Sequence, residues 1–187
     1  TDQILPARYL KWPRARGLGA VLFQDLRFAA DGAECPDFPL NKPIWRDAKI
    51  LIAGRNFGGG SSREAAVYAL YDAGIRCVIA PSFGDIFAEN AVKNGLLTAV
   101  VLGADSAELA ASVAANPARP ITVDLEAQTI TYDSSSCTFT VTVNADTAPP
   151  IVQCPTNILA ATCDPNGMIV NYPLPGVSDD IDPSPTV

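Results

Sequence analysis

A glycine-rich loop between two short apolar runs constrains the fold of this chain more than any other stretch. The loop contains four glycines, Gly54, Gly58, Gly59 and Gly60. It follows the apolar run Ile50–Ile52 and leads through Ser61–Glu64 into an alanine-rich helical pattern. Gly74 ends that pattern before a second apolar run at 77–79. Strand, glycine loop, helix and strand in this order predict a βαβ unit within residues 48–80.

The chemistry of this loop predicts a binding site for an anion. The start of a helix leaves backbone N–H groups unpaired and carries the positive end of the helix dipole, and glycines let a ligand approach the backbone closely. The guanidinium of Arg63 is a planar fork that suits a carboxylate or a phosphate. Ser61 or Ser62 supplies a hydroxyl that either caps the helix or faces the ligand. In a purely structural alternative, a serine only caps the helix and Glu64 adds charge to its first turn, but such a cap needs at most two of the four glycines.

Two common phosphate motifs do not fit the loop. The Walker pattern needs Gly-Lys-Ser/Thr at the end of the loop, where this chain has no Lys. The dinucleotide fingerprint needs the spacing G-x-G-x-x-G, which Gly58–Gly60 do not provide. We therefore expect an anion other than a nucleotide.

Composition argues against several other classes of function. The net charge of −7 disfavours non-specific binding to nucleic acid. No apolar run reaches membrane-spanning length, and the first residues show no signal-peptide pattern. The chain has no His, which excludes a Ser-His-Asp triad, and it has no CxxC pair, so we expect no zinc site.

The character of the chain changes near residue 133. Before this point, alternating helical and strand patterns predict an α/β domain with parallel pairing at its centre. The predicted strands are 48–53, 76–80 and 96–102 with a hairpin at 121–132, and the predicted helices lie near 20–26, after Pro81 and at 106–115. Residues 134–187 contain no Lys or Arg, and short strands between prolines, with one at 137–143, indicate part of a β-sandwich. The alternative is a disordered acidic tail.

Residues 1–132 resemble the small subunit of 3-isopropylmalate dehydratase, in the aconitase superfamily. The resemblance rests on Thr-Asp-Gln-Ile-x-Pro-Ala-Arg-Tyr-Leu at 1–10, Pro-Asp-Phe-Pro-Leu-Asn at 36–41 and Ala-Gly-Arg-Asn-Phe-Gly-x-Gly-Ser-Ser-Arg-Glu at 53–64. It continues through residues 74–83, Asp-Ile-Phe at 85–87 and Lys-Asn-Gly-Leu-Leu at 93–97. So many matched stretches in order make this combination highly specific.

The resemblance implies a swivelling β/β/α three-layer domain, like the fourth domain of aconitase. Such a domain closes over a large subunit that holds a [4Fe–4S] cluster, in a heterodimer or heterotetramer, and this chain would carry no cofactor of its own. The implied reaction interconverts 2-isopropylmalate and 3-isopropylmalate by removing and re-adding water, in the leucine biosynthesis of the cytoplasm. The implied partners are the large subunit and a small dicarboxylate, without nucleic acid or membrane.

The resemblance also implies roles for the residues of the loop. Ser61 is the candidate base, because a helix start and a nearby arginine make an alkoxide less costly. Arg63 is the second catalytic candidate and clamps a substrate carboxylate, while Asp2, Gly60 and Ser62 complete the substrate-binding set. The segment from Tyr9 to about Asp37 would select the substrate, and we interpret Arg8 as an ordinary surface charge.

Three positions depart from the family pattern. Gly59 stands where Cys is common, Ala65 where His usually follows Ser-Ser-Arg-Glu, and Thr98 where Pro usually follows Gly-Leu-Leu. The missing His leaves a second hypothesis open, in which a degenerate dehydratase domain is part of a non-catalytic adhesion or binding protein. A third hypothesis is a related hydro-lyase that acts on citraconate or dimethylmalate.

Residues 133–187 resemble parts of hyalin-repeat modules, which are immunoglobulin-like extracellular domains. The resemblance rests on Cys-x-Phe-x-Val-x-Val at 137–143, Ala-Pro-Pro-Ile at 148–151, Cys-Pro-x-Asn-Ile at 154–158 and Val-Asn-Tyr-Pro at 170–173. It implies an incomplete immunoglobulin-like β segment, as a fusion or a chimeric tail. Such a module alone would suggest an oxidising, extracellular setting, where Cys163 bridges to Cys154 or Cys137.

Overall fold

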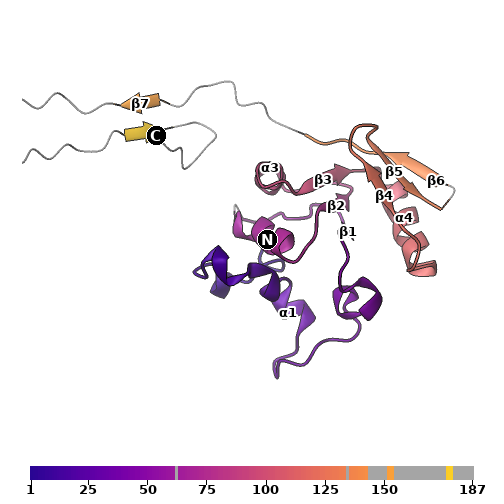
Figure 1. Ribbon diagram of the computed structural model, residues 1–187, viewed down its shortest axis with the longest axis horizontal. Helices are drawn as coiled ribbons and strands as arrows, with labels where there is room; N and C mark the ends of the chain where they lie inside the picture. Colours follow the sequence, from indigo (N-terminus) through magenta and orange to yellow (C-terminus); the bar gives the residue numbers. More distant parts are fainter. Residues whose placement is uncertain (62, 134, 143–150, 154–175, 179–187) are drawn as a thin grey trace, which may run out of the picture. The chain divides into compact units, whose positions relative to one another are not determined.

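The computed structural model describes residues 1–61, 63–133, 135–142, 151–153 and 176–178. The chain divides into two compact units, Thr1–Val143 and Asn144–Val187 (Figure 1). The first unit contains nearly all the described residues, including the predicted βαβ region. Among the described residues, no helix is both long enough and apolar enough to cross a lipid bilayer.

A three-stranded parallel sheet lies at the centre of the first unit. Its strands β1 (Ile50–Ile52), β2 (Cys77–Ala80) and β3 (Leu97–Val100) are arranged in the order β1-β2-β3. Helix α2 (Ala65–Asp72) connects β1 to β2, and α3 (Asp85–Lys93) connects β2 to β3. Both strand pairs are parallel, which confirms the predicted α/β domain with parallel pairing at its centre.

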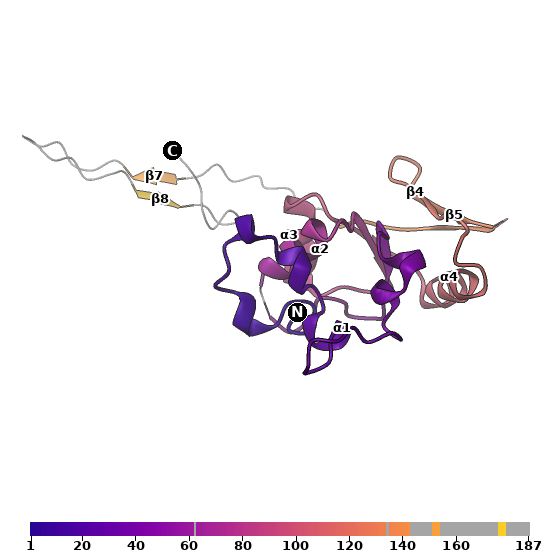
Figure 2. The same cartoon turned by 60° about the horizontal axis from the view of Figure 1, so that its bottom comes forward.

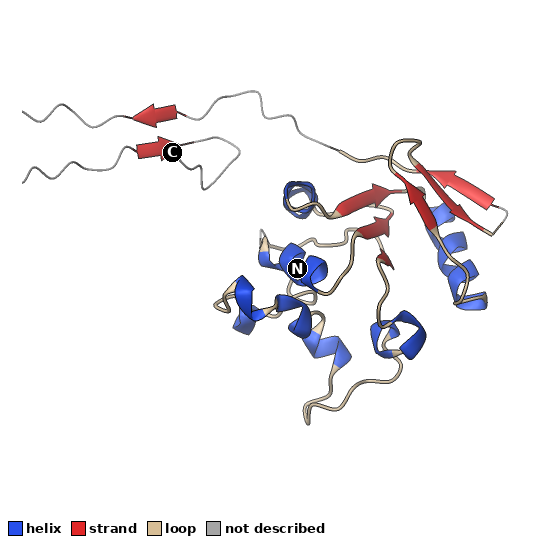
Figure 3. Cartoon of the chain, viewed as in Figure 1, coloured by secondary structure: helices blue, strands red, loops and turns tan. Residues whose placement is uncertain are grey.

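Side chains of β2 alternate between two hydrophobic clusters, one on each face of this sheet. Val78 belongs to a cluster with Leu70 of α2 and Phe87 of α3. Cys77 and Ile79 belong to the other cluster, with residues of α4 (Gly103–Ala115) and of a second sheet. Figures 2 and 3 show α2 and α3 apart from α4 and the second sheet, with the parallel strands between them. All four residues of β2 are buried, as expected for a strand covered on both faces.

The second sheet is antiparallel and consists of β4 (Thr122–Asp124), β5 (Thr129–Tyr132) and β6 (Ser135–Thr138) in that order. The predicted hairpin at 121–132 is confirmed by the pairing of β4 with β5. The strand predicted at 137–143 is shifted to Ser135–Thr138, because its pairing with β5 begins with Tyr132 opposite Ser135. Beyond β6, Phe139 is 2% exposed within the core. The compact unit therefore ends at Val143, whereas the sequence places the domain boundary after residue 132.

Short helices dominate the chain before β1. They are η1 (Ala7–Tyr9), η2 (Arg14–Arg16), η3 (Leu18–Val21), α1 (Gln24–Arg27), η4 (Pro39–Asn41) and η5 (Pro43–Trp45). The single helix predicted near 20–26 is wrong, since η3 and α1 are separated by Leu22 and Phe23. Phe23 has a φ of 53° and donates its N–H to the Ile4 carbonyl at 2.8 Å. Burial of the Phe23 side chain in the core fixes this break.

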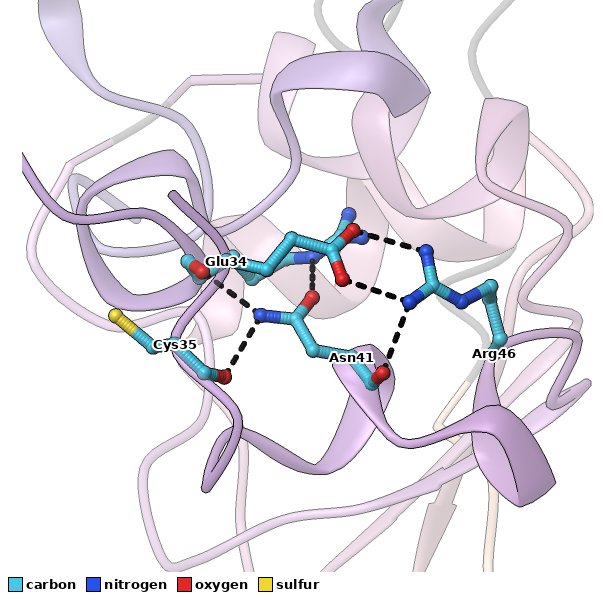
Figure 4. A network of polar contacts seen from close by, with 5 residues as sticks. Glu34, Cys35, Asn41 and Arg46 are labelled. Atoms are coloured by element: carbon cyan, nitrogen blue, oxygen red, sulfur yellow. Dashed lines mark hydrogen bonds and ion pairs between the residues drawn. The ribbon is translucent and has the colours of Figure 1, made fainter. Parts of the chain in front are cut away.

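A buried asparagine fixes the segment between α1 and η5 (Figure 4). The side-chain amide of Asn41 donates to the carbonyls of Arg27 and Cys35 at 2.7 and 3.0 Å, and its oxygen accepts from Arg27 Nε at 2.9 Å. Arg46 donates to the Asn41 carbonyl and binds both carboxylate oxygens of Glu34. Burial lowers the pKa of the Arg27 guanidinium from its ordinary value. Asn41 is only 5% exposed, so water cannot easily replace these contacts.

The second unit contains an antiparallel pair, β7 (Ile151–Gln153) with β8 (Gly176–Ser178). The immunoglobulin-like character expected for residues 133–187 depends largely on positions outside the described residues. Cys154 and Cys163 lie there as well, whereas Cys137 is a free thiol.

We expect Asn41→Ala to lower the free energy of unfolding by roughly 2–4 kcal/mol, because it removes three side-chain hydrogen bonds and leaves the Nε–H of half-buried Arg27 without its acceptor. Urea denaturation followed by circular dichroism measures this change. Asn116→Ala is the matched control, since Asn116 is exposed and should change stability by about 0.5 kcal/mol or less. Equal effects of the two substitutions would contradict the role of the network.

Candidate functional site

Two loops are joined at the carboxyl edge of the parallel sheet, one after β1 and one after β2. Phe57 donates its N–H to the Ser82 carbonyl at 3.0 Å, and Gly84 donates its N–H to the Phe57 carbonyl at 2.9 Å. The Ser82 hydroxyl accepts the N–H of Asn56 at 2.8 Å. Edges of this kind are where open α/β sheets bind ligands. The glycine loop that follows Phe57 is therefore held at the expected place for a site.

Two of the glycines are required by close packing. Gly58 has a φ of 75°, and a Cβ on it would overlap the ring of Phe87 in α3. A Cβ on Gly84 would lie 2.9 Å from the Gly59 backbone. These contacts bring the loop against the start of α3, where side chains larger than hydrogen do not fit.

Ser61 is fixed by the first residue of the chain. The hydroxyl oxygens of Ser61 and Thr1 are 2.8 Å apart, and the Ser61 N–H donates to Thr1 Oγ1 at 3.2 Å. The Thr1 backbone nitrogen also donates to the Gly59 carbonyl at 2.7 Å. Two separate stretches of sequence thus meet at the serine predicted to be the base.

Arg63 forms an ion pair with Asp2 through its Nη1 atom. The Arg63 side chain is 26% exposed and that of Asp2 is 71% exposed, so the pair lies at the surface end of the site. A guanidinium has five N–H donors, so one carboxylate contact leaves capacity for another. The arrangement is suited to bind an anion next to the Ser61 hydroxyl.

Ser61 does not cap helix α2. The helix begins at Ala65, its N-cap residue is Glu64, and no side chain makes a cap hydrogen bond there. Glu64 instead accepts from Asn94 Nδ2 at 2.8 Å and so connects α2 to the end of α3. Burial, together with a hydrogen bond to Glu64, raises the pKa of Tyr68. The purely structural alternative therefore fails for Ser61, while Ser62 lies outside the described residues.

A cavity of about 190 Å³ lies beside Ser61. It is lined by the glycine loop and the start of α3, through Gly58, Gly59, Gly60, Ser61, Gly84, Asp85, Ile86 and Phe87. A larger cavity of about 500 Å³ lies elsewhere, between β1 and the second half of α4, and its lining is mostly apolar. We regard the smaller one as the functional cavity, because Gly60 and Ser61 of the predicted site line it.

The structure brings four of the predicted site residues together, namely Asp2, Gly60, Ser61 and Arg63. Arg8 lies apart from them in an exposed ion pair with Asp25. Sequence reasoning missed Thr1 and Asp85 as parts of the site. The position of Asp85, directly after the loop that follows β2, is a signal that could have identified it. Thr1 stands within the Thr-Asp motif but has no periodic or spacing signal of its own.

Among the described residues, no three Cys, Asp or Glu side chains come together in a way that could hold a metal ion. Cys35, Cys77 and Cys137 are free thiols. Burial raises the pKa of Cys77 to about 12, which keeps this thiol protonated. The three described cysteines therefore do not form a shared set of metal ligands.

Comparisons with known proteins identify the family. The Aconitase C-terminal domain family matches residues 1–102, and the LeuD_N family matches residues 107–142. The small subunit of 3-isopropylmalate dehydratase from Jannaschia sp. is 52% identical over 142 residues, which are 75% of this chain and 71% of that protein. The chain belongs to the family of 3-isopropylmalate dehydratase small subunits.

Other members of this family support the assignment. The small subunit from Rhodospirillum centenum is 56% identical over 75% of this chain and 70% of its own length. The one from Methylobacterium radiotolerans is 53% identical over 70% of this chain and 65% of its own length. The chain thus spans about two thirds of these relatives. A solved 3-isopropylmalate dehydratase (leuD) from Methanocaldococcus jannaschii matches with a TM-score of 0.57 and 26% identity, over 76% of this chain and 75% of that one.

The structure gives each departure from the family pattern a location. A Cβ on Gly59 would lie 2.6 Å from the Asn56 side chain, so the Cys common in the family requires Asn56 to move. Ala65 begins α2 and packs against the hydrophobic cluster of that helix. Thr98 is buried in β3 and takes no part in the site. Only the first two departures can therefore affect the loop directly.

We expect Gly58→Ala to destabilise the chain by roughly 2–4 kcal/mol, through the left-handed backbone and the overlap with Phe87. Thermal unfolding of purified protein measures the loss. Gly54→Ala in the same loop is the control, because a Cβ there meets nothing within 4 Å. A larger loss for the Gly54 variant would refute this account of the loop.

We expect Cys77 to resist alkylation in the native chain, since it is buried and its raised pKa disfavours the thiolate. Iodoacetamide at about pH 8, close to the ordinary pKa of a thiol, should label half-buried Cys35 first, as read by peptide mass spectrometry. The control is denaturant, which should equalise the two rates. Rapid labelling of native Cys77 would contradict its burial.

Proposed function

We propose that this chain is the small subunit of a 3-isopropylmalate dehydratase. In this role it interconverts 2-isopropylmalate and 3-isopropylmalate together with a separate large subunit. The observation that carries the proposal is the convergence of Asp2, Ser61 and Arg63 within the region matched by the family. The finer architecture that we propose is a swivelling β/β/α domain that closes over the partner.

Ser61 acts in this proposal as the base. Removing water from a hydroxy acid requires a proton to leave the carbon next to a carboxylate, while hydroxide leaves the adjacent carbon. With its own proton released to solvent, Ser61 Oγ takes the carbon-bound proton as an alkoxide. The electron pair of the broken C–H bond forms the carbon–carbon double bond, and the hydroxide takes a proton from solvent and leaves as water. Re-addition of water in the opposite orientation yields the isomer, with Ser61 returning the proton. The cavity of about 190 Å³ beside Ser61 receives the reacting end of the substrate.

Arg63 binds a carboxylate of the substrate, and Asp2 holds its guanidinium in place. The contact with Asp2 uses Nη1 and so orients the fork. Gly60 lets the backbone approach the ligand, since a Cβ there meets nothing closer than the Thr1 nitrogen at 3.9 Å. We include Ser62 in the substrate-binding set by resemblance to the family. The substrate class is therefore a small dicarboxylate.

In this proposal, the partner subunit supplies the metal cofactor of the reaction. We propose that the [4Fe–4S] cluster lies on the large subunit, because Cys35, Cys77 and Cys137 of this chain are separate free thiols. A cluster of this kind supplies a Lewis acid that polarises the departing hydroxyl group. Free thiols fit a reducing compartment, and we propose the cytoplasm as the site of the reaction.

A test of the proposal combines the chain with the cluster-loaded large subunit of a relative, such as the dehydratase of Jannaschia sp. Turnover of 3-isopropylmalate supports the enzyme. Complex formation without turnover would support the non-catalytic binding protein instead. Faster turnover of citraconate or dimethylmalate than of isopropylmalate would assign the chain to a related hydro-lyase.

We expect Ser61→Ala to lower kcat by at least about 1,000-fold, because the substitution removes the oxygen that takes the proton in this proposal. Steady-state assays with the large subunit measure kcat. Ser136→Ala is the control, since Ser136 is exposed on β6 and does not line the cavity. A rate near that of the wild type would remove Ser61 from the role of base.

We expect Arg63→Lys to raise KM for the dicarboxylate by roughly 10- to 100-fold, because an ammonium cannot form the bidentate contact of a guanidinium. Initial rates over a range of substrate concentrations provide KM. Arg8→Lys serves as the matched control, because Arg8 lies in an exposed ion pair away from the cavity. An unchanged KM in the Arg63 variant would show that the clamp lies elsewhere.

A further inference from the structure

The side chain of Thr1 contacts the predicted base twice and has no role yet in the proposed reaction. Its hydroxyl oxygen lies 2.8 Å from Ser61 Oγ and accepts the Ser61 N–H at 3.2 Å. The Thr1 nitrogen donates to the Gly59 carbonyl at 2.7 Å, on the other side of Gly60. Thr1 therefore contacts the loop at two points, Gly59 and Ser61.

The direction of the hydroxyl contact follows from the chemistry of the two states of Ser61. A hydroxyl has one proton to donate and two lone pairs that accept. Because Thr1 Oγ1 accepts the Ser61 N–H, its own proton is available for Ser61 Oγ. An alkoxide at Ser61 can only accept, so in that state Thr1 must be the donor. The same geometry keeps the oxygen of Ser61 in place during proton transfer.

We propose that Thr1 is a positioning residue for the dehydratase reaction, which orients the Ser61 hydroxyl and donates a hydrogen bond to its alkoxide. This inference rests on the proposed function, because it assigns Thr1 a role through Ser61. Thr1 does not touch the substrate in this scheme.

Three charged groups face the same region and set its electrostatics. Asp2 and Arg63 form an ion pair beside the Thr1–Ser61 contact, and Asp85 at the start of α3 lines the cavity with Ser61. The carboxylates of Asp2 and Asp85 disfavour a negative charge on Ser61, whereas the guanidinium of Arg63 favours it. The Thr1 hydroxyl, as a neutral donor to Ser61 Oγ, therefore stabilises the alkoxide. It does so without adding a charge that would compete for the substrate.

The test compares Thr1→Val, which keeps the shape and removes the hydroxyl, with Thr1→Ser, which keeps the hydroxyl. In the complex with the large subunit, Thr1→Val should lower kcat on the order of 10- to 100-fold, the range for a hydrogen bond to a charged group, with KM within about twofold. Thr1→Ser should restore most of the rate. The acidic limb of the kcat/KM profile should move to higher pH in Thr1→Val, because loss of a donor makes the alkoxide harder to form. Wild-type kcat in Thr1→Val would overturn the proposal.

A second measurement needs no turnover. Amide hydrogen exchange at Ser61 in the full chain should be faster in Thr1→Val and close to wild type in Thr1→Ser, because only the first loses the acceptor of the Ser61 N–H. Thr131→Val, at an exposed position of β5, controls for the substitution itself and should change neither exchange nor kcat. If the wild-type chain shows no turnover, the proposed function fails, and the exchange rates still show whether Thr1 orients Ser61. Unchanged exchange in Thr1→Val would refute the positioning role by itself.

Discussion

The backbone hydrogen bonds between the loops after β1 and β2 are the constraint on which the site depends. They extend the parallel pairing of the strands beyond the sheet, through Phe57, Ser82 and Gly84. The ring of Phe57 then packs edge-on against Phe87 at 5.4 Å, and Gly58 passes over that ring without a side chain. The glycine loop thus starts from a point fixed by the sheet, and contacts with Thr1 and Asp2 then hold Ser61 and Arg63.

Sequence periodicity predicted the central α/β arrangement because burial on both faces leaves a strong signal. The apolar runs of β1 and β2 and the alanine-rich pattern of α2 all form the predicted elements. The region before β1 was less predictable, since its breaks depend on distant contacts such as the bond from Phe23 to Ile4. The same limit applies to β6, where pairing with β5 overrides the polar character of Ser135 and Ser136.

Four of the residues predicted for the site lie close together, but the sequence did not predict their supporting contacts. Glycines, serine and arginine in one loop can be recognised from local chemistry, and the structure places Asp2 with them. Thr1 could not be selected from local chemistry, because its importance arises from a contact with Ser61 sixty positions away. Capping by Ser61 was the wrong local interpretation, since the helix starts only at Ala65.

The contacts of Thr1 and Asp2 with the glycine loop also affect the order in which the chain folds. They join residues 60 and 61 positions apart, so they form only after a long segment has been ordered between them. Local elements such as α2 can form early. Closure of so long a loop, in contrast, loses conformational entropy before any stabilising contact forms. We therefore expect the anion site to be among the last parts of the domain to assemble. A chain with native secondary structure can therefore still be inactive, and binding competence reports on complete folding better than helix content does.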